Sequence, residues 1–110
     1  FLAEDIKKIT AFPNPYFGVN SAEVSRYNHF VTFSHLPNKV SIRVFDLSGT
    51  LVQRLDKDDN DQFLRWGLDN ENGLPVASGM YFVHIDMPDI NKTRILKLAV
   101  VGEQQFLENF

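Results

Sequence analysis

The stretch Val40–Leu55, VSIRVFDLSGTLVQRL, decides the fold class of this chain. Its first half alternates, with Val40, Ile42 and Val44 on one face and polar residues between them. A period of two is typical of a strand that has one side in the core and one side in water. Gly49 follows this run, and glycine accepts the positive φ that a tight hairpin turn needs. The stretch therefore predicts a β-hairpin.

A second stretch, Gly73–Ile85, contains the next clear strand. After Gly79, alternate residues of MYFVHI again fall on opposite faces. Segments rich in Pro, Asn, Asp and Gly separate the remaining runs and favour turns. Short strands with turns about 8–12 residues apart, and no strong helical period, predict an antiparallel β-sandwich of about seven strands. The clearest strands are predicted at about 29–35, 39–46, 50–56, 62–68, 80–85 and 93–101.

The two ends of the chain differ from this pattern. The last predicted strand, TRILKLAVV, is apolar on both faces, which favours a place inside a sheet. Residues 16–27 show no period and are predicted to form a loop. The predicted organisation is a linker or lead-in segment at 1–9, the sandwich at 10–101 and a C-terminal tail at 102–110, which could make one helical turn.

Composition narrows the function. The 110 residues are 44% apolar and include ten Phe, which is enough for one domain with a real core. The net charge is −3, whereas small nucleic-acid binders are usually basic. No apolar run approaches the roughly 18 residues of a membrane helix, and the absence of Cys excludes disulfides and thiolate chemistry. Because the chain begins at Phe1, we expect a longer precursor with an export signal upstream.

Several short segments occur in a fixed order along the chain. They are FPNP, FSHLPNKVSIRVFDLSGTLVQRL, the tryptophan followed by the NENG loop, VASGMYFVHI and KLAVV. In this order they resemble the type A C-terminal sorting domain of the type IX secretion system. They are also similar to the Ig-like domain of flagellar hook-capping proteins, which shares the plan "DLSG…W…NG…VASG-Y". The resemblance covers roughly residues 10–101.

The resemblance implies an Ig-like sandwich without enzymatic activity, cofactor or metal, at the end of an exported bacterial protein. It implies recognition by an outer-membrane shuttle protein. In many members a sortase-like peptidase then removes the domain and attaches the cargo to the cell surface, so the protein is expected to be secreted or surface-bound. The positions carried over for partner recognition are Pro13, Asn14, Pro15, Asp46, Gly49, Gly79, Tyr81, Lys97 and Val100.

Some of these positions also have a local structural interpretation. Pro13 and Pro15 stiffen the approach to the first strand. Asp46 can cap the backbone of the hairpin turn. Tyr81 can bury its ring while its hydroxyl finds a hydrogen-bond partner.

The C-terminal tail departs from the family pattern. Family members usually end within a few residues of the last strand, whereas Gly102–Phe110 follows Val101 here. The apolar residues Phe106, Leu107 and Phe110 could dock this tail on a neighbour. An alternative function is therefore a retained Ig-like structural or adhesion module in a cell-surface assembly.

Candidate metal ligands occur in two loops. Asp56, Asp58, Asn60 and Asp61 supply the hard oxygen atoms that Ca²⁺ requires. An EF-hand, however, would need Gly at the position of Asp61 and Glu at the position of Gly67. A second candidate is the loop with Asp69, Glu71 and Asn72. A solvated turn is the favoured interpretation of both loops.

The histidines and aromatic residues are also candidate ligands for zinc and for sugars. His29, His35 and His84, without any Cys, do not make up a zinc ligand set. A carbohydrate-binding module is a weaker alternative, because aromatic rings can stack on sugars. Its platform would combine Trp66 with Tyr16, Tyr27 and Phe82, although a place for Trp66 in the core is favoured.

Overall fold

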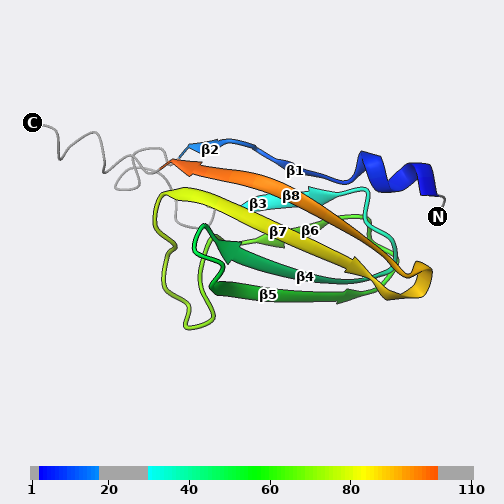
Figure 1. Cartoon of the computed structure of the whole chain (residues 1–110). Helices are drawn as coiled ribbons and strands as arrows, with labels where there is room; N and C mark the ends of the chain where they lie inside the picture. The colour runs from blue at the N-terminus through cyan, green and yellow to red at the C-terminus, as the bar shows by residue number, and fades with distance from the viewer. Residues whose placement is uncertain (1–2, 18–29, 102–110) are drawn as a thin grey trace, which may run out of the picture.

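The computed structural model describes residues 3–17 and 30–101, which form two β-sheets packed as a sandwich (Figure 1). One sheet has the strand order β1-β3-β6, and the other has the order β2-β8-β7-β4-β5. The predicted all-β sandwich is confirmed. The elements are η1 (Ala3–Lys8), β1 (Thr10–Phe12), β2 (Tyr16–Phe17), β3 (Val31–Ser34), β4 (Lys39–Asp46), β5 (Leu51–Asp58), β6 (Leu64–Trp66), β7 (Gly79–Met87), η3 (Pro88–Ile90) and β8 (Lys92–Val101).

The predicted hairpin forms one side of the five-stranded sheet, with β5 at its edge. β4 pairs with β5 on one side and with β7 on the other, both antiparallel. β7 pairs in turn with β8 along its whole length. Gly49 has φ of +90°, as the turn requires. The last strand lies between β7 and β2, so its predicted place inside a sheet is confirmed.

The core is built from the inward faces of these strands. Ile42 and Val44 on β4 are 0% exposed, and so are Val83 and Ile85 on β7. Phe33 and Trp66 cover them from the three-stranded sheet. The period-2 pattern of the sequence therefore identified the buried face of β4 correctly, whereas for β7 it predicted only the alternation. The segment before β1 also contributes, because Ile9 is fully buried.

The central strand of the smaller sheet is more buried than its sequence predicts. Thr32 and Ser34 are polar and alternate with Val31 and Phe33, yet all four residues of β3 are buried. β3 lies between β1 and β6, where Thr32 has Phe12 and Arg65 as its cross-strand neighbours. These longer side chains shield the smaller one from solvent.

Two predicted boundaries are wrong. The strand expected over residues 62–68 covers only Leu64–Trp66, because Phe63 N donates to the Asp61 carboxylate in a turn and Leu68 has φ of +57°. The loop expected over residues 16–27 begins with two strand residues, which pair in parallel with the end of β8. The rest of that loop and the predicted tail 102–110 lie outside the described residues.

A buried lysine closes one end of the five-stranded sheet. The side chain of Lys57 is 1% exposed. Its Nζ donates to the carbonyl oxygens of Pro37 at 2.9 Å, Asn38 at 3.1 Å and Asp59 at 2.9 Å, and lies 3.1 Å from the Asp59 carboxylate. An ammonium group has three donors, so each one finds an acceptor. Lys57 therefore joins the loop before β4 to the loop after β5.

Within residues 3–17 and 30–101, no helix has the length and apolar character needed to cross a membrane.

Replacing Ile42 with Ala tests the core. Ile42 is 0% exposed, so Ile42→Ala should lower the free energy of unfolding by about 2–5 kcal/mol, measured by chemical denaturation. Ile95→Ala is the matched control, because Ile95 is 61% exposed on the outer face of the same sheet. Equal losses in the two variants would contradict the assignment of the core face.

Replacing Lys57 with Met tests the ammonium contacts. Lys57→Met keeps the length of the apolar stem but leaves three carbonyl oxygens without their donor, so unfolding should become easier by about 1–3 kcal/mol. Lys39→Met, at an exposed position on β4, should change the stability little. Similar melting temperatures for both variants and the wild type would show that the buried contacts contribute nothing.

Candidate functional site

Most positions that the sequence marked for recognition lie at one end of the sandwich. Val100, near the end of β8, pairs with Tyr16 of β2 on one side and with Gly79 of β7 on the other. Tyr81 pairs with Asp46, the last residue of β4. The end of β8, the start of β7 and the end of β4 therefore lie together, at the left of Figure 1.

The Asn of the Pro-Asn-Pro segment binds the edge of the last strand. Asn14 Nδ2 donates to the Lys97 carbonyl oxygen at 2.7 Å, and Asn14 Oδ1 accepts from Ala99 N at 3.2 Å. In a parallel β-ladder, the backbone N–H and C=O groups of a residue at this position would make the same two hydrogen bonds. Tyr16, two residues on, continues the ladder with its own backbone. The side-chain amide thus extends the pairing between β2 and β8.

Asp46 holds the hairpin turn. Its Oδ1 accepts hydrogen bonds from Ser48 N at 3.0 Å, Ser48 Oγ at 2.6 Å and Thr50 N at 3.0 Å. The predicted capping of the turn is confirmed. The Ser48 hydroxyl first, and the Thr50 backbone amide next, hold the pKa of Asp46 below its ordinary value. The carboxylate is therefore a structural acceptor.

Tyr81 links the sheet to the loop that precedes β7. The residue is 5% exposed, and its ring meets Trp66 edge-on with centroids 6.2 Å apart. Its hydroxyl donates to the carbonyl oxygen of Ala77. Burial, and then the charge of Asp46, raise the pKa of the Tyr81 phenol. The predicted burial of the ring with a partner for its hydroxyl is confirmed.

The loop between β6 and β7 is held by amide side chains. Asn70 Oδ1 accepts from the backbone N–H groups of Asn72 at 2.9 Å and Leu74 at 3.0 Å. Gln53 on β5 donates to the Asn70 carbonyl oxygen at 3.1 Å. The sequence predicts this loop only as a turn. The signal that could have identified Asn70 is its position at the start of a turn, three residues before Gly73. An Asn side chain at such a position accepts hydrogen bonds from the backbone of the turn.

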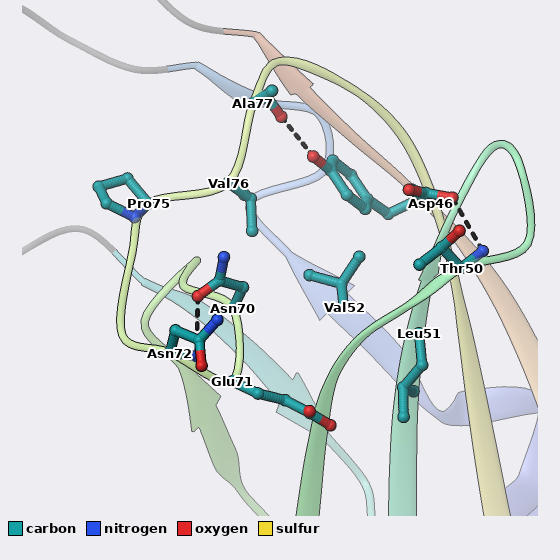
Figure 2. Close-up of a pocket in the computed structure, with 11 residues that line it drawn as sticks. Asp46, Thr50, Leu51, Val52, Asn70, Glu71, Asn72, Pro75, Val76 and Ala77 are labelled. Atoms are coloured by element: carbon teal, nitrogen blue, oxygen red, sulfur yellow. Dashed lines mark hydrogen bonds between the residues drawn. The ribbon is translucent and has the colours of Figure 1, made fainter.

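A shallow hollow of about 370 Å³ lies between the hairpin turn and this loop. Figure 2 shows Asp46 and Thr50 on one side and Asn70 and Asn72 on the other. Val76, between them, adds an apolar wall. The Asp46 and Asn70 acceptors bind backbone amides, so these two side chains shape the hollow.

The candidate metal ligands do not come together. Among residues 3–17 and 30–101, no group of three or more His, Asp or Glu side chains could hold a metal ion. In the Asp56–Asp61 segment, the cation that meets the carbonyl oxygens is the Lys57 ammonium. The same ammonium lies 3.1 Å from the Asp59 carboxylate, and this contact, followed by the hydrogen bond from the Asp61 backbone amide, lowers the pKa of Asp59.

The sugar-binding platform is contradicted by the structure. Trp66 is 1% exposed and its Nε1 donates to the Asp69 carbonyl oxygen at 3.0 Å, so its faces are not free to stack on a sugar. The core position favoured for Trp66 is confirmed. His84 bonds to Arg43 on the outer face of the sheet, while His35 bonds to Ser34. The other candidates on this list, His29, Tyr27, Phe106, Leu107 and Phe110, lie outside the described residues.

A family model for secretion system C-terminal sorting domains matches residues 10–100. The chain belongs to this family. The resemblance proposed from the sequence is therefore confirmed. Sorting domains of the type IX system mark proteins that are exported to the cell surface or secreted, as the sequence predicted. No curated protein matches the chain.

Solved structures support the Ig-like fold of the sorting domain. PorZ, a surface component of the type-IX secretion system of Porphyromonas gingivalis, matches with a TM-score of 0.71 and 24% identity, over 90% of this chain and 12% of PorZ. Dimeric latent PorU from the same organism matches with a TM-score of 0.61 and 20% identity, over 86% of this chain and 9% of PorU. FlgD from P. aeruginosa reaches a TM-score of only 0.43, at 20% identity, over 67% of this chain and 62% of FlgD.

Acid titration of the Asp46→Asn variant tests the turn. The folded pKa of Asp46 is lowered, so its charge contributes stability above the ordinary pKa of 3.8, and this is lost as pH falls through the folded value. Asp46→Asn keeps the Oδ1 acceptor but not the charge. The stability gap between wild type and variant should therefore narrow below about pH 4.

The difference in stability between wild type and variant reports on Asp46 alone. Asp59 also has a lowered pKa, but it titrates in both proteins and its effect cancels. Denaturation midpoints should be compared from neutral pH down to the acid transition. A gap that stays constant over this range would contradict the electrostatic role of Asp46.

Proposed function

We propose that this sorting domain is a non-enzymatic signal that outer-membrane secretion machinery recognises at one end of the sandwich. The end consists of the Pro-Asn-Pro segment, the Asp46 turn, the start of β7 and the end of β8. The observation that carries the proposal is that recognition positions far apart in sequence meet there through strand register. We name this region the recognition end.

The residues of the recognition end divide into two kinds. Tyr81 and Val100 are 5% and 7% exposed, so they shape the end without being available to a partner. Pro13, Pro15 and Lys97 are exposed. These three side chains are therefore the proposed contacts, and the buried residues hold them in position.

The polar groups of the recognition end support a role in binding rather than catalysis. Asp46, Asn14 and the Tyr81 hydroxyl each bind backbone groups of the domain. A nucleophile needs an adjacent base that is free to accept its proton. The Asp46 carboxylate accepts from the Ser48 hydroxyl at 2.6 Å, but its lowered pKa makes it a weak base. The proposed partners are an outer-membrane shuttle protein and a sortase-like peptidase, which would remove the domain and attach the cargo to the cell surface.

A retained structural or adhesion module remains the second hypothesis for the domain. The mass of the mature protein at the cell surface separates the two. Loss of the domain after export favours a cleaved signal, whereas a mature protein that keeps it favours a permanent module.

Export of a reporter tests the recognition end. Residues 1–110 should be fused to a periplasmic reporter in a type IX-competent host, and Lys97→Glu should be compared with the wild type. Because Lys97 is exposed, the substitution should leave the fold intact but reverse the charge offered to the partner. Export should fall by about tenfold or more, because an opposite charge would then face the partner.

Lys7→Glu is the matched control, because Lys7 is exposed on η1 and undergoes the same change of charge. Purified variants should melt within a few degrees of the wild type, which separates recognition from unfolding. Deleting β8 would not separate them, since this strand pairs with β7 along its whole length. Equal export of both variants and the wild type would remove Lys97 from the recognition element.

A further inference from the structure

The outer face of the five-stranded sheet carries a row of basic side chains. The register places His84 of β7 opposite Arg43 of β4, and Arg43 opposite Arg54 of β5. The next residues along β4, Ile42 and Val44, are fully buried, so this row points away from the core. We name His84, Arg43 and Arg54 the basic row.

The basic row violates the usual rule for cross-strand pairs. Like charges directly opposite each other destabilise a sheet, yet Arg43 and Arg54 occupy such a pair. Arg43 Nη2 donates to His84 Nδ1 at 3.2 Å. Arg54 lies 3.5 Å from Asp56, but both side chains are about 60% exposed, so this ion pair offsets little. A bound anion would relieve the repulsion.

An apolar row lies beside the basic row. The register aligns Phe82, Phe45 and Leu51 across the same three strands. Leu51 is 41% exposed, and the two Phe side chains are partly exposed. A free-standing sheet face is expected to be polar on its outer side. The apolar row therefore adds a second feature that a partner would cover.

We propose that the two rows dock an acidic protein segment. Its carboxylates would pair with Arg43 and Arg54, since guanidinium groups bind carboxylates through two parallel hydrogen bonds. Its apolar side chains would cover Phe45, Phe82 and Leu51. Nucleic acid or a small inorganic anion could use the basic row but would leave the apolar row exposed to water, so a protein fits both.

The net charge of −3 does not oppose this partner at close range. Charges more than about 8 Å apart are largely screened at physiological ionic strength. The next row along the same face carries the carboxylates of Asp86 and Asp56, so the acidic segment would lie over the basic and apolar rows and away from these two residues. The docking face goes beyond the proposed sorting function and does not depend on it. Lys97, opposite Phe82, is the residue that borders both surfaces.

Peptide binding to the purified chain 1–110 tests the docking face. The probe is a short synthetic peptide in which Glu alternates with Leu and Phe, titrated while backbone NMR signals are followed. We expect shifts along β4, β5 and β7, and binding that weakens as salt is added. The double variant Arg43→Glu, Arg54→Glu should bind about tenfold more weakly or worse, because both guanidinium partners are lost.

The control is Lys7→Glu, Lys92→Glu, which makes the same change in net charge at two exposed positions away from the rows. It should bind the peptide as the wild type does. Melting temperatures of both double variants should be compared with that of the wild type, to exclude unfolding as the cause.

Three results would overturn the proposal. Shifts confined to other surfaces would reject the docking face, and equal binding by inorganic phosphate or by a peptide with Ser in place of Leu and Phe would reduce it to a simple anion patch. Self-association that the Arg43→Glu, Arg54→Glu variant abolishes would identify a second copy as the occupant. Because no secretion is measured, failure of the sorting function would not affect this test.

Discussion

The antiparallel register between β4 and β7 is the constraint on which the rest of the structure depends. Side chains alternate along both strands, so a slip of one residue would move every core side chain into water. The observed register buries Ile42 against Ile85 and Val44 against Val83. The same register also aligns the outward residues, so the core and the outer face are two results of one alignment.

Polar side chains replace backbone partners at three places where strands of the five-stranded sheet begin or end. Lys57 fills a ring of carbonyl oxygens that would otherwise need water or a metal ion. Asn14 continues a parallel ladder with its side-chain amide, and Asp46 closes the hairpin with its carboxylate. Backbone N–H and C=O groups need hydrogen-bond partners, and in each case one side chain satisfies two or more of them. These residues are therefore constrained by folding before any partner is considered.

The requirements of folding divide the positions of the recognition motif into two kinds. A position can match the family because the fold requires it, as the buried Tyr81 does, or because a partner contacts it, as the exposed Lys97 is proposed to be. Both kinds lie at the recognition end, since strand register brings them there together. The basic and apolar rows differ, because no folding requirement explains two opposed arginines beside exposed aromatic rings.

The sequence by itself determined the features that depend on neighbours along the chain. The alternation at Val40, Ile42 and Val44, the glycine of the turn and the Asp46 cap all follow from local backbone geometry, and each was predicted correctly. The family could also be identified from the order of its short motifs.

Only the tertiary structure decided which residues face one another across strands. The burial of Thr32, the contacts of Lys57 and the pairing of Arg43 with Arg54 all depend on segments distant in sequence. A single sequence carries no direct record of these partners, because strand pairing depends on the packing of the whole sheet and on edge or centre position. For the same reason, the alternation along a strand predicts which residues share a face of the sheet. It does not predict which residues of neighbouring strands form the basic and apolar rows.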